Sequence, residues 1–303
     1  MLFLFWELLG VISYLLINYW SNKINNGIKS IIFNKLGDYF LLLLISINYS
    51  LISINFNYLM VNHSILNLCY YYCINLSLIN PTLIVICLLL IVYSKSAQLP
   101  FCSWLLNAIS APTPISALLH SSTLVIAGVY INIIIDDLFI LLSDYYSIVY
   151  LLLFNIPFVT LIWSLFKSLI VNDIKSIIAL STISQLSYMF IILALNPILS
   201  LVHIIIHSLF KSLLFIVCGS IIHINLNYQL INYVKLPFNS FILIWVIFNV
   251  MVLIIAISKE MIIIALFNGL IGYFYFFVVV VGGLFSLLYS VRLYVYCFWL
   301  LLY

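Results

Sequence analysis

The chain has 303 residues, of which 67% are hydrophobic and only 6% are charged, and its formal net charge is +3. Its mean hydropathy of +1.34 is incompatible with a water-facing surface of ordinary charge density. The composition therefore excludes a soluble globular domain and predicts a polytopic, all-α membrane protein with spans of about 20 residues. Continuous apolar runs, rather than strict alternation, also exclude a membrane β-barrel.

Apolar runs separated by polar loops predict about nine transmembrane helices. Residues 53–79 form the longest connection and are predicted to lie at the membrane interface. The first 20 residues have no basic segment before their apolar run, so we interpret them as a span and not as a signal peptide. The predicted spans are 1–20, 31–52, 80–108, 113–133, 147–168, 175–195, 198–225, 240–268 and 270–300.

The charges of the connecting loops follow the positive-inside rule. If the N-terminus lies outside, Asp136, Asp137 and Asp144 fall on the outer side, and no lysine or arginine does. A missed span would scatter the basic residues over both sides, so the pattern supports the count of nine. The basic residues on the inner side are then Lys23, Lys29, Lys167, Lys175, Lys235 and Arg292.

Ten of the ionisable residues within predicted spans stand out, because a charge at the bilayer centre costs about 2.5–3.5 kcal/mol even on the insertion scale. Lys35 and Asp38 lie near one end of their span, where they could pair one turn apart. Such residues indicate either a functional pathway or buried pairs that lock helices together. The ten are Glu7, Lys35, Asp38, Lys95, His120, His203, His207, Lys211, Lys259 and Glu260.

The stretch IVYSKSAQLPF (91–101) combines a lysine with a proline inside an apolar run. Pro100 cannot donate a backbone hydrogen bond, so the helix is predicted to break just beyond Lys95. Glu7 is the only acidic residue deep in a span and is the expected partner of Lys95. A desolvated lysine beside a carboxylate can change its proton occupancy when the carboxylate moves or is neutralised. These residues therefore predict a proton switch.

A helix is predicted to begin within APTPISALLHSST (111–123), with Thr113 as its cap and Pro114 at its first position. His120 lies about two turns further on. Its imidazole can both donate and accept a proton, so a role in proton transfer is open. The alternative is a hydrogen-bonded histidine of the core.

The stretch HIIIHSLFK places His203, His207 and Lys211 on one helix face over about 12 Å. The spacing of the two histidines could suit a metal ion. A metal site is disfavoured because no carboxylate or cysteine completes the ligand set and Lys211 would repel a cation. A polar wire along the membrane midplane is the preferred interpretation.

Together these motifs resemble one protein family. The stretch KSAQLPFCSWLLNAISAPTPISALLHSSTLVIAGVY (95–130) is similar to the signature of chain 5 of mitochondrial NADH–ubiquinone oxidoreductase, the distal antiporter-like subunit of respiratory complex I. The large subunit of Mrp-type sodium/proton antiporters shares it. Further stretches that agree in the right order are 6–20, 34–38, 172–190, 203–222, 258–262 and 288–294.

The resemblance implies a core of two inverted five-helix repeats, each with one discontinuous helix. Residues 1–133 would form the first antiporter-like half, lacking its opening helix, and residues 147–300 the second half. Family members usually begin with four further helices and end with extra spans and a long lateral helix. We therefore expect a truncated or split form, with separate polypeptides supplying the N- and C-terminal helices.

The resemblance also assigns roles to the intramembrane residues. Glu7 and Lys95 resemble the first-half glutamate–lysine pair, and His120 resembles the histidine that links the halves. Lys211 resembles the central lysine, and Lys259 the exit-side lysine in a second broken helix. The expected supporting residues are Lys35, Asp38, His203, His207 and Glu260.

The function that the resemblance implies is proton translocation in the membrane arm of complex I, coupled to NADH:ubiquinone oxidoreduction. The chain would be a non-redox subunit of the mitochondrial inner membrane, encoded in the mitochondrial genome. NAD, FMN, iron–sulfur clusters and ubiquinone would be bound elsewhere in the complex, and this chain would hold no cofactor or metal. Its expected partners are other membrane-arm subunits and lipid, with no nucleic acid. The alternatives are an Mrp-type sodium/proton antiporter subunit and a structural remnant.

Overall fold

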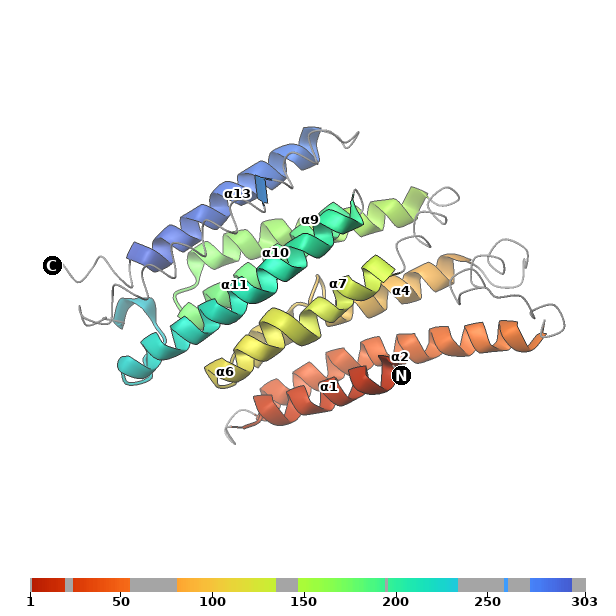
Figure 1. Cartoon of the computed structure of the whole chain (residues 1–303), viewed down its shortest axis with the longest axis horizontal. Coiled ribbons are helices and arrows are strands. Elements are labelled where there is room, and N and C mark those ends of the chain that lie inside the picture. Colours follow the sequence, from red (N-terminus) through yellow and green to blue (C-terminus); the bar gives the residue numbers. More distant parts are fainter. Residues whose placement is uncertain are drawn as a thin grey trace.

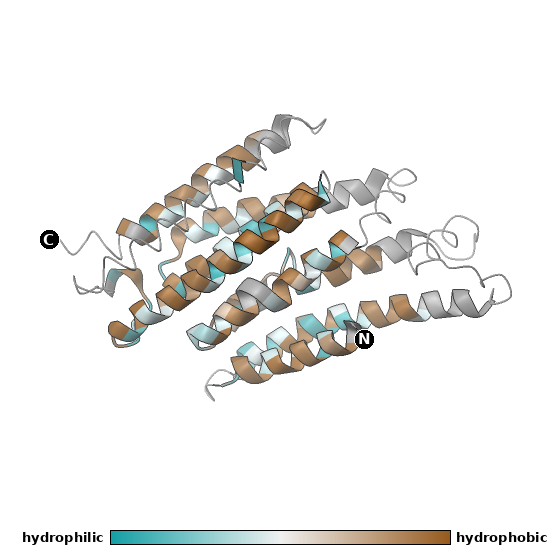
Figure 2. Cartoon of the chain, in the orientation of Figure 1, coloured by the Kyte–Doolittle hydropathy of each residue, from teal (hydrophilic) through white to brown (hydrophobic). Residues whose placement is uncertain are grey.

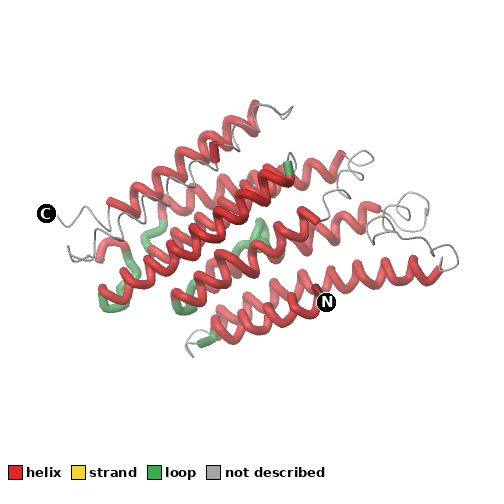
Figure 3. The backbone as a smooth tube through the Cα atoms, in the orientation of Figure 1, coloured by secondary structure: helices red, strands yellow, loops and turns green. Residues whose placement is uncertain are grey.

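The computed structural model describes residues 2–19, 24–54, 81–134, 147–193, 196–233, 259–260 and 273–295. In these ranges the chain is helical apart from short turns and loops, and its long helices lie side by side in one bundle (Figure 1). Figure 3 shows that the described loops are short and gather at the helix ends and at one interruption within the bundle. The predicted all-α membrane fold is confirmed. The helices long and apolar enough to cross a membrane by length and composition are Thr113–Ile133, Ile174–Leu193 and Pro197–Ile224, and the shorter apolar helices are Leu4–Ile17, Ile86–Lys95, Asn155–Ile170 and Val279–Leu293.

The first part of the bundle consists of α1 (Leu2–Ile17), α2 (Ile24–Ile54) and the helix that follows them in space, α4 (Pro81–Lys95). α2 packs against both α1 and α4. It begins before the predicted span 31–52, because the polar stretch ahead of that span continues the same helix. Lys35 is therefore more than two turns inside a helix instead of near its end.

The predicted span 80–108 is interrupted as its proline indicates. α4 ends at Lys95 and α5 (Ser103–Ala108) begins after a turn that contains Pro100, whose bond to Leu99 is cis. α5 packs against α2.

The next segment changes from an α-helix to a π-helix and back to an α-helix. It consists of α6 (Thr113–Ser116), the π-helix η3 (Ala117–Thr123) and α7 (Leu124–Ile134). Thr113 does not cap the first helix of this segment, α6. Instead, the carbonyl of Pro112 accepts hydrogen bonds from the backbone N–H groups of Ile115 and Ser116.

The second part of the bundle is built around α10 (Ile174–Leu193), whose residues are buried almost throughout. α10 packs against α9 (Ser147–Ile170) and α11 (Pro197–Ile224), and α9 also contacts α13 (Tyr273–Tyr294). The short 3-10 helix η4 (Ile231–Tyr233) follows α11. α11 starts at Pro197 because the Oδ1 of Asn196 accepts hydrogen bonds from the N–H groups of Ile198 and Leu199.

Arg292 and Lys175, two of the residues assigned to the inner side, lie at the same end of the bundle. Arg292 of α13 donates to the carbonyls of Leu169 and Val171 at the C-terminal end of α9. Lys175, at the start of α10, donates to the carbonyl of Ala111 over 3.1 Å. Residues 53 and 54 of the predicted connection 53–79 belong to α2, and its remainder lies outside the described residues, as does the predicted span 240–268 apart from residues 259–260.

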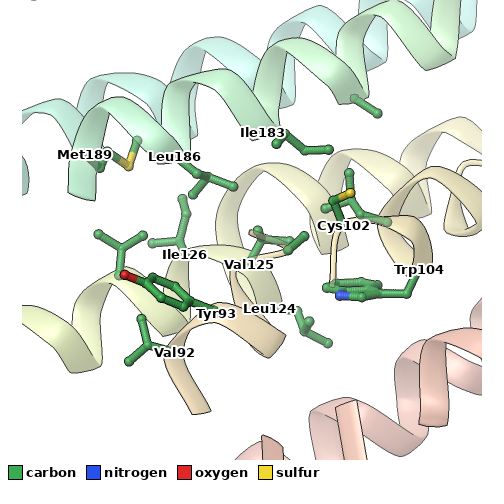
Figure 4. Packing of buried hydrophobic residues seen from close by; sticks show 14 of the residues in the cluster. Val92, Tyr93, Cys102, Trp104, Leu124, Val125, Ile126, Ile183, Leu186 and Met189 are labelled. Carbon is green, nitrogen blue, oxygen red and sulfur yellow. The ribbon is translucent and has the colours of Figure 1, made fainter. Parts of the chain in front are cut away.

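Two clusters of buried apolar residues hold the bundle together. Figure 4 shows the first, in which side chains of α4, α5 and α7 meet Ile183, Leu186 and Met189 of α10. α10 also supplies residues to the second cluster, which includes Phe215 of α11 and Val279 of α13. One central helix is thus packed into both halves of the chain. Large apolar side chains also cover the outer faces of α1 and α11.

Candidate functional site

The first group of charged side chains surrounds the break between α4 and α5. Lys95, the last residue of α4, lies with its Nζ 2.6 Å from Oδ1 of Asp38 on α2. The two side chains are 0% and 3% exposed. The indole ring of Trp6 on α1 lies 4.9 Å from the same Nζ, within the range of a cation–π interaction. Lys95 is therefore a buried cation held by a carboxylate and an aromatic face.

A second ion pair lies one helix further out. Lys35 Nζ on α2 donates to Oε1 of Glu7 on α1 over 2.9 Å, and the two side chains are 47% and 33% exposed. Glu7 is therefore paired with Lys35 and not with Lys95 as predicted. Lys35 and Asp38 do not pair with each other either. The reason is that α2 packs against both α1 and α4, so it presents Lys35 to one neighbour and Asp38 to the other.

Polar side chains stabilise the turn between α4 and α5. A helix break frees carbonyl groups that need new donors. The indole Nε1 of Trp104 donates to the carbonyl of Ser94 over 3.0 Å. Oε1 of the buried Gln98 accepts from the hydroxyl of Thr160 on α9 over 2.5 Å. The break near Pro100 is thus tied to a helix of the second half.

His120 lies in the π-helix η3, which packs against α11. The Oγ1 of Thr123 donates to the carbonyl of Leu118, five residues earlier, as π-helical spacing allows. π-helical segments inside α-helices are rare and occur frequently at functional sites. The side chain of His120 lies outside the described residues, so its role as a link between the halves stays a prediction.

α11 carries the polar row that its residue spacing predicts. His203, His207 and Lys211 are buried on one face, and the two imidazole centroids lie 6.4 Å apart. Lys211 lies about 20 Å from each end of the helix, near its middle. Its Nζ donates to the hydroxyl of Ser181 on α10. Within the ranges that the structure describes, no three His, Cys, Asp or Glu side chains gather where they could hold a metal ion.

Lys259 lies beside α13 in the second half. Its Nζ donates to the hydroxyl of Ser286 over 2.5 Å and lies 5.7 Å from the centroid of the Tyr188 ring. The adjacent Glu260 is exposed. Both 259 and 260 are helical, and the predicted break next to them lies outside the described residues.

The helices that carry these groups lie across the bundle, from α1 at one edge to α13 at the other (Figure 1), and we call the groups together the row. Figure 2 shows that hydrophilic residues occur among the apolar residues partway along α2 and α11, and not only at the helix ends. The contacts along the row, in order, are Glu7–Lys35, Asp38–Lys95, Lys211–Ser181 and Lys259–Ser286.

Three groups that hold the lysines are not among the predicted site residues: Trp6, Ser181 and Ser286. Serines in membrane helices often donate to a carbonyl of the preceding turn, as Ser181 also does to Ile178 over 2.7 Å. The sequence around such a serine does not indicate whether its oxygen also accepts a hydrogen bond from another helix. The available signal was the spacing of Ser181 and Gln185, which places two polar residues on one face of α10.

The sequence matches the model of a known family over nearly its full length. The family is described as "NADH:quinone oxidoreductase/Mrp antiporter, TM", and the match covers residues 1–290.

Curated relatives agree with this match. The chain is 41% identical over 236 residues to NADH-ubiquinone oxidoreductase chain 5 of Wickerhamomyces canadensis, covering 76% of this chain and 34% of the relative. It is 34% identical over 303 residues to chain 5 of Apis mellifera ligustica, covering 95% of this chain and 50% of the relative. NADH-quinone oxidoreductase subunit L of Buchnera aphidicola is 36% identical over 73% of this chain and 35% of the relative. The chain thus spans about a third to a half of the length of these relatives.

Solved structures support the same fold. A chain of the membrane-bound sulfane sulfur reductase, an archaeal respiratory membrane complex, matches 97% of this chain and 61% of its own length with a TM-score of 0.79 at 21% identity. A chain of the Mrp complex from Dietzia sp. DQ12-45-1b matches 98% of this chain and 32% of its own length with a TM-score of 0.76 at 21% identity. By sequence and by fold, the chain belongs to the NADH:quinone oxidoreductase/Mrp antiporter family of membrane proteins.

Proposed function

We propose that this chain is a proton-translocating subunit of the membrane arm of respiratory complex I. The observation that carries the proposal is the row of lysines within the bundle, each with its own polar partner on a neighbouring helix. Ionisable residues are rare in membrane helices and mark proton and ion pathways. The names of the curated relatives indicate NADH–ubiquinone oxidoreductase as the host complex.

The lysine of the first half and the two lysines of the second half have partners of different chemistry, and this difference suits the transfer of protons. Lys95 is paired with Asp38, and opening this pair leaves a buried cation without its carboxylate, which is costly. Lys211 and Lys259 are held by the neutral hydroxyls of Ser181 and Ser286, which stabilise a cation less than a carboxylate does. A charge change at one lysine alters the energy of the next, because the bundle interior screens charges poorly.

The chain acts in this proposal as a non-redox subunit of a proton-translocating NADH:ubiquinone reductase. NAD, FMN, iron–sulfur clusters and ubiquinone are bound by other subunits. The chain resides in the mitochondrial inner membrane and is encoded in the mitochondrial genome. The support for this location is the set of mitochondrial chain 5 relatives, together with a composition dominated by Ile, Leu, Phe, Tyr, Asn and Ser.

The Glu7–Lys35 pair supports a protein neighbour beside α1 and α2. Each residue lies about 15 Å along its helix from the turn that joins the two helices, so the pair is at membrane depth. Both side chains are partly exposed, and charged groups facing lipid at this depth are costly. A further polypeptide of the membrane arm, or one that supplies additional family helices, would cover the pair.

Replacement of Lys211 by methionine tests the proposed function. In sealed vesicles that carry the assembled complex, Lys211→Met is expected to abolish NADH-driven proton uptake and to leave electron transfer from NADH to an artificial acceptor in place. Lys29→Met is the matched control, because Lys29 is an exposed lysine near the start of α2. Proton uptake that persists in Lys211→Met at the wild-type ratio to NADH oxidised would refute the proposal.

An Mrp-type sodium/proton antiporter subunit is the second candidate, supported by the likeness to a chain of the Dietzia Mrp complex. The two candidates differ in what drives proton movement. A sodium gradient imposed on vesicles without NADH should move protons only if the chain is an antiporter subunit. The complex I proposal predicts no response to sodium and a full response to NADH.

A further inference from the structure

α10 carries a polar row of its own that runs beside the row on α11. Ser181 and Gln185 are spaced by four residues and are fully or almost fully buried. On α11, Lys211 and His207 have the same spacing and are likewise buried. Residues four apart lie on the same face of a helix, one turn from each other.

Two contacts fix how α10 and α11 lie against each other. Ser181 accepts a hydrogen bond from Lys211, and Met189 accepts one through its carbonyl from the Ser200 hydroxyl over 3.1 Å. The residue number rises on one helix as it falls on the other, so the helices are antiparallel. Gln185, one turn beyond Ser181 toward Met189, therefore lies at the level of His207.

Gln185 and His207 both have buried polar atoms that need partners. Neither the amide oxygen nor the amide nitrogen of Gln185 has a hydrogen-bond partner among the described residues. The same holds for both ring nitrogens of His207. Buried polar groups are satisfied in native proteins in the great majority of cases, and ordered water supplies the partner where protein does not.

The neighbouring threonine and serine side chains of α10 are satisfied within their own helix. The hydroxyls of Thr182, Ser184 and Ser187 donate to the carbonyls three residues earlier, at 2.7, 2.9 and 2.7 Å respectively. Ser181 donates in the same way to Ile178, and this fixes its oxygen as the acceptor for Lys211. Gln185 therefore differs from its neighbours in having its full hydrogen-bonding capacity available.

We propose that Gln185 is a positioning residue that holds an ordered water molecule against His207, one turn from Lys211. The amide provides two donors and one acceptor, and a neutral imidazole provides one of each. One water between them receives the two to four hydrogen bonds that a buried water needs. This water carries a proton between the Nζ of Lys211 and the imidazole of His207. The inference rests on the proposed function, because it adds a residue of α10 to the same proton pathway.

The proposed step moves one proton from Lys211 to His207 and leaves the water unchanged overall. Protonated Lys211 gives a proton to the water while the water gives another to the acceptor nitrogen of His207. The Nζ–H bond breaks, an N–H bond forms on the imidazole, and the water is unchanged. Gln185 keeps the water oriented and takes up no proton.

The experiment compares three variants in sealed vesicles that carry the assembled complex. Gln185→Met keeps the length and volume of the side chain and removes both hydrogen-bonding groups. Gln185→His restores a donor and an acceptor. Thr182→Val is the matched control, because it removes a buried hydroxyl of α10 that bonds to its own helix. The readouts are protons taken up per NADH oxidised and NADH oxidation with an artificial acceptor.

Gln185→Met is expected to lower the number of protons per NADH as far as Lys211→Met does, with assembly and oxidation by the artificial acceptor retained. Gln185→His should recover part of this loss, and Thr182→Val should match the wild type. A purely structural role would instead lower assembly and leave the ratio of protons to NADH unchanged. If Lys211→Met abolishes uptake but Gln185→Met does not, the inference about Gln185 fails and the proposed function stands. If Lys211→Met has no effect, the proposed function itself fails.

A density map of the wild-type complex that resolves water gives a test independent of activity and of the folding of any variant. A water peak within hydrogen-bond distance of both the Gln185 amide and the His207 ring is expected. A direct hydrogen bond between the two side chains, or another protein group in that place, would overturn the inference.

Discussion

The lysines of the bundle differ in the chemistry that holds each charge. Lys95 lies against Asp38, whereas Lys211 and Lys259 donate to serine hydroxyls. Breaking a buried pair by removing one partner is usually far more destabilising than replacing both by apolar groups. The pairs can therefore be separated experimentally by their response to single and double substitution.

Asp38→Asn is expected to destabilise the assembled protein by about 3–5 kcal/mol, because Lys95 would keep a buried charge without its carboxylate. The double variant Asp38→Asn with Lys95→Met should recover most of this loss and still fail to translocate protons. Thermal denaturation of the isolated complex and proton uptake by vesicles measure the two effects. Equal stability of the single and the double variant would contradict the assignment of a buried ion pair.

The polar residues of this pathway show what a single sequence can and cannot reveal. The break after Lys95 follows from Pro100, and the shared face of His203, His207 and Lys211 follows from helix spacing. Both are local properties. The partner of Glu7 is not local, because it depends on which helix α1 packs against. The contact of a serine with a lysine of another helix is not local either.

At the scale of the elements, the break in α4–α5 is enclosed by two glycines, Gly37 of α2 and Gly128 of α7. A Cβ at Gly128 would lie 2.9 Å from the carbonyl oxygen of Val92 and 3.1 Å from the backbone nitrogen of Ser96. A Cβ at Gly37 would lie 3.3 Å from Cε of Lys95. The neighbouring helices thus approach the break closely only because these positions lack side chains.

Gly128→Ala is expected to destabilise the protein by about 1–3 kcal/mol, because the new methyl group presses on backbone atoms at the break. Gly10→Ala is the control, since a Cβ there meets nothing within 4 Å and alanine favours a helix. The thermal midpoint of the isolated complex should fall for the first variant and stay equal or rise for the second. A fall of the same size in both would show that close approach is not the cause.

Arg292 joins two elements that are far apart in the sequence. Its guanidinium donates to carbonyls at the C-terminal end of α9 and, over 2.5 Å, to the side chain of Asn172. A cation at the C-terminal end of a helix is also favoured by the helix dipole.

Arg292→Met is expected to cost about 1.5–3 kcal/mol, the range for hydrogen bonds to charged groups. Arg292→Lys should lose less, because it keeps the charge but lacks the planar fork that reaches several acceptors. The thermal midpoints of the two variants measure the difference. A lysine variant as unstable as the methionine variant would show that the charge contributes nothing.

At the scale of the whole molecule, the bundle has a charged pair at one edge. Leu8, next to Glu7 on α1, is 55% exposed. If another polypeptide covers the Glu7–Lys35 pair, a photoreactive amino acid at position 8 should attach to protein. Mass spectrometry of the native complex would identify the attached chain. Attachment to lipid alone would contradict a protein neighbour at this face.

The π-helix η3 joins two helices, α6 and α7, that pack against different neighbours. α6 and η3 pack against α11, whereas α7 also reaches α4. A single residue removed between 117 and 123 would turn α7 by about 100° relative to α6. One set of contacts would then face away from its partner. The segment formed by α6, η3 and α7 should therefore tolerate substitutions at its exposed positions but no change in its length. Deletion scanning would then identify it as the segment that fixes how the two parts of the bundle pack together.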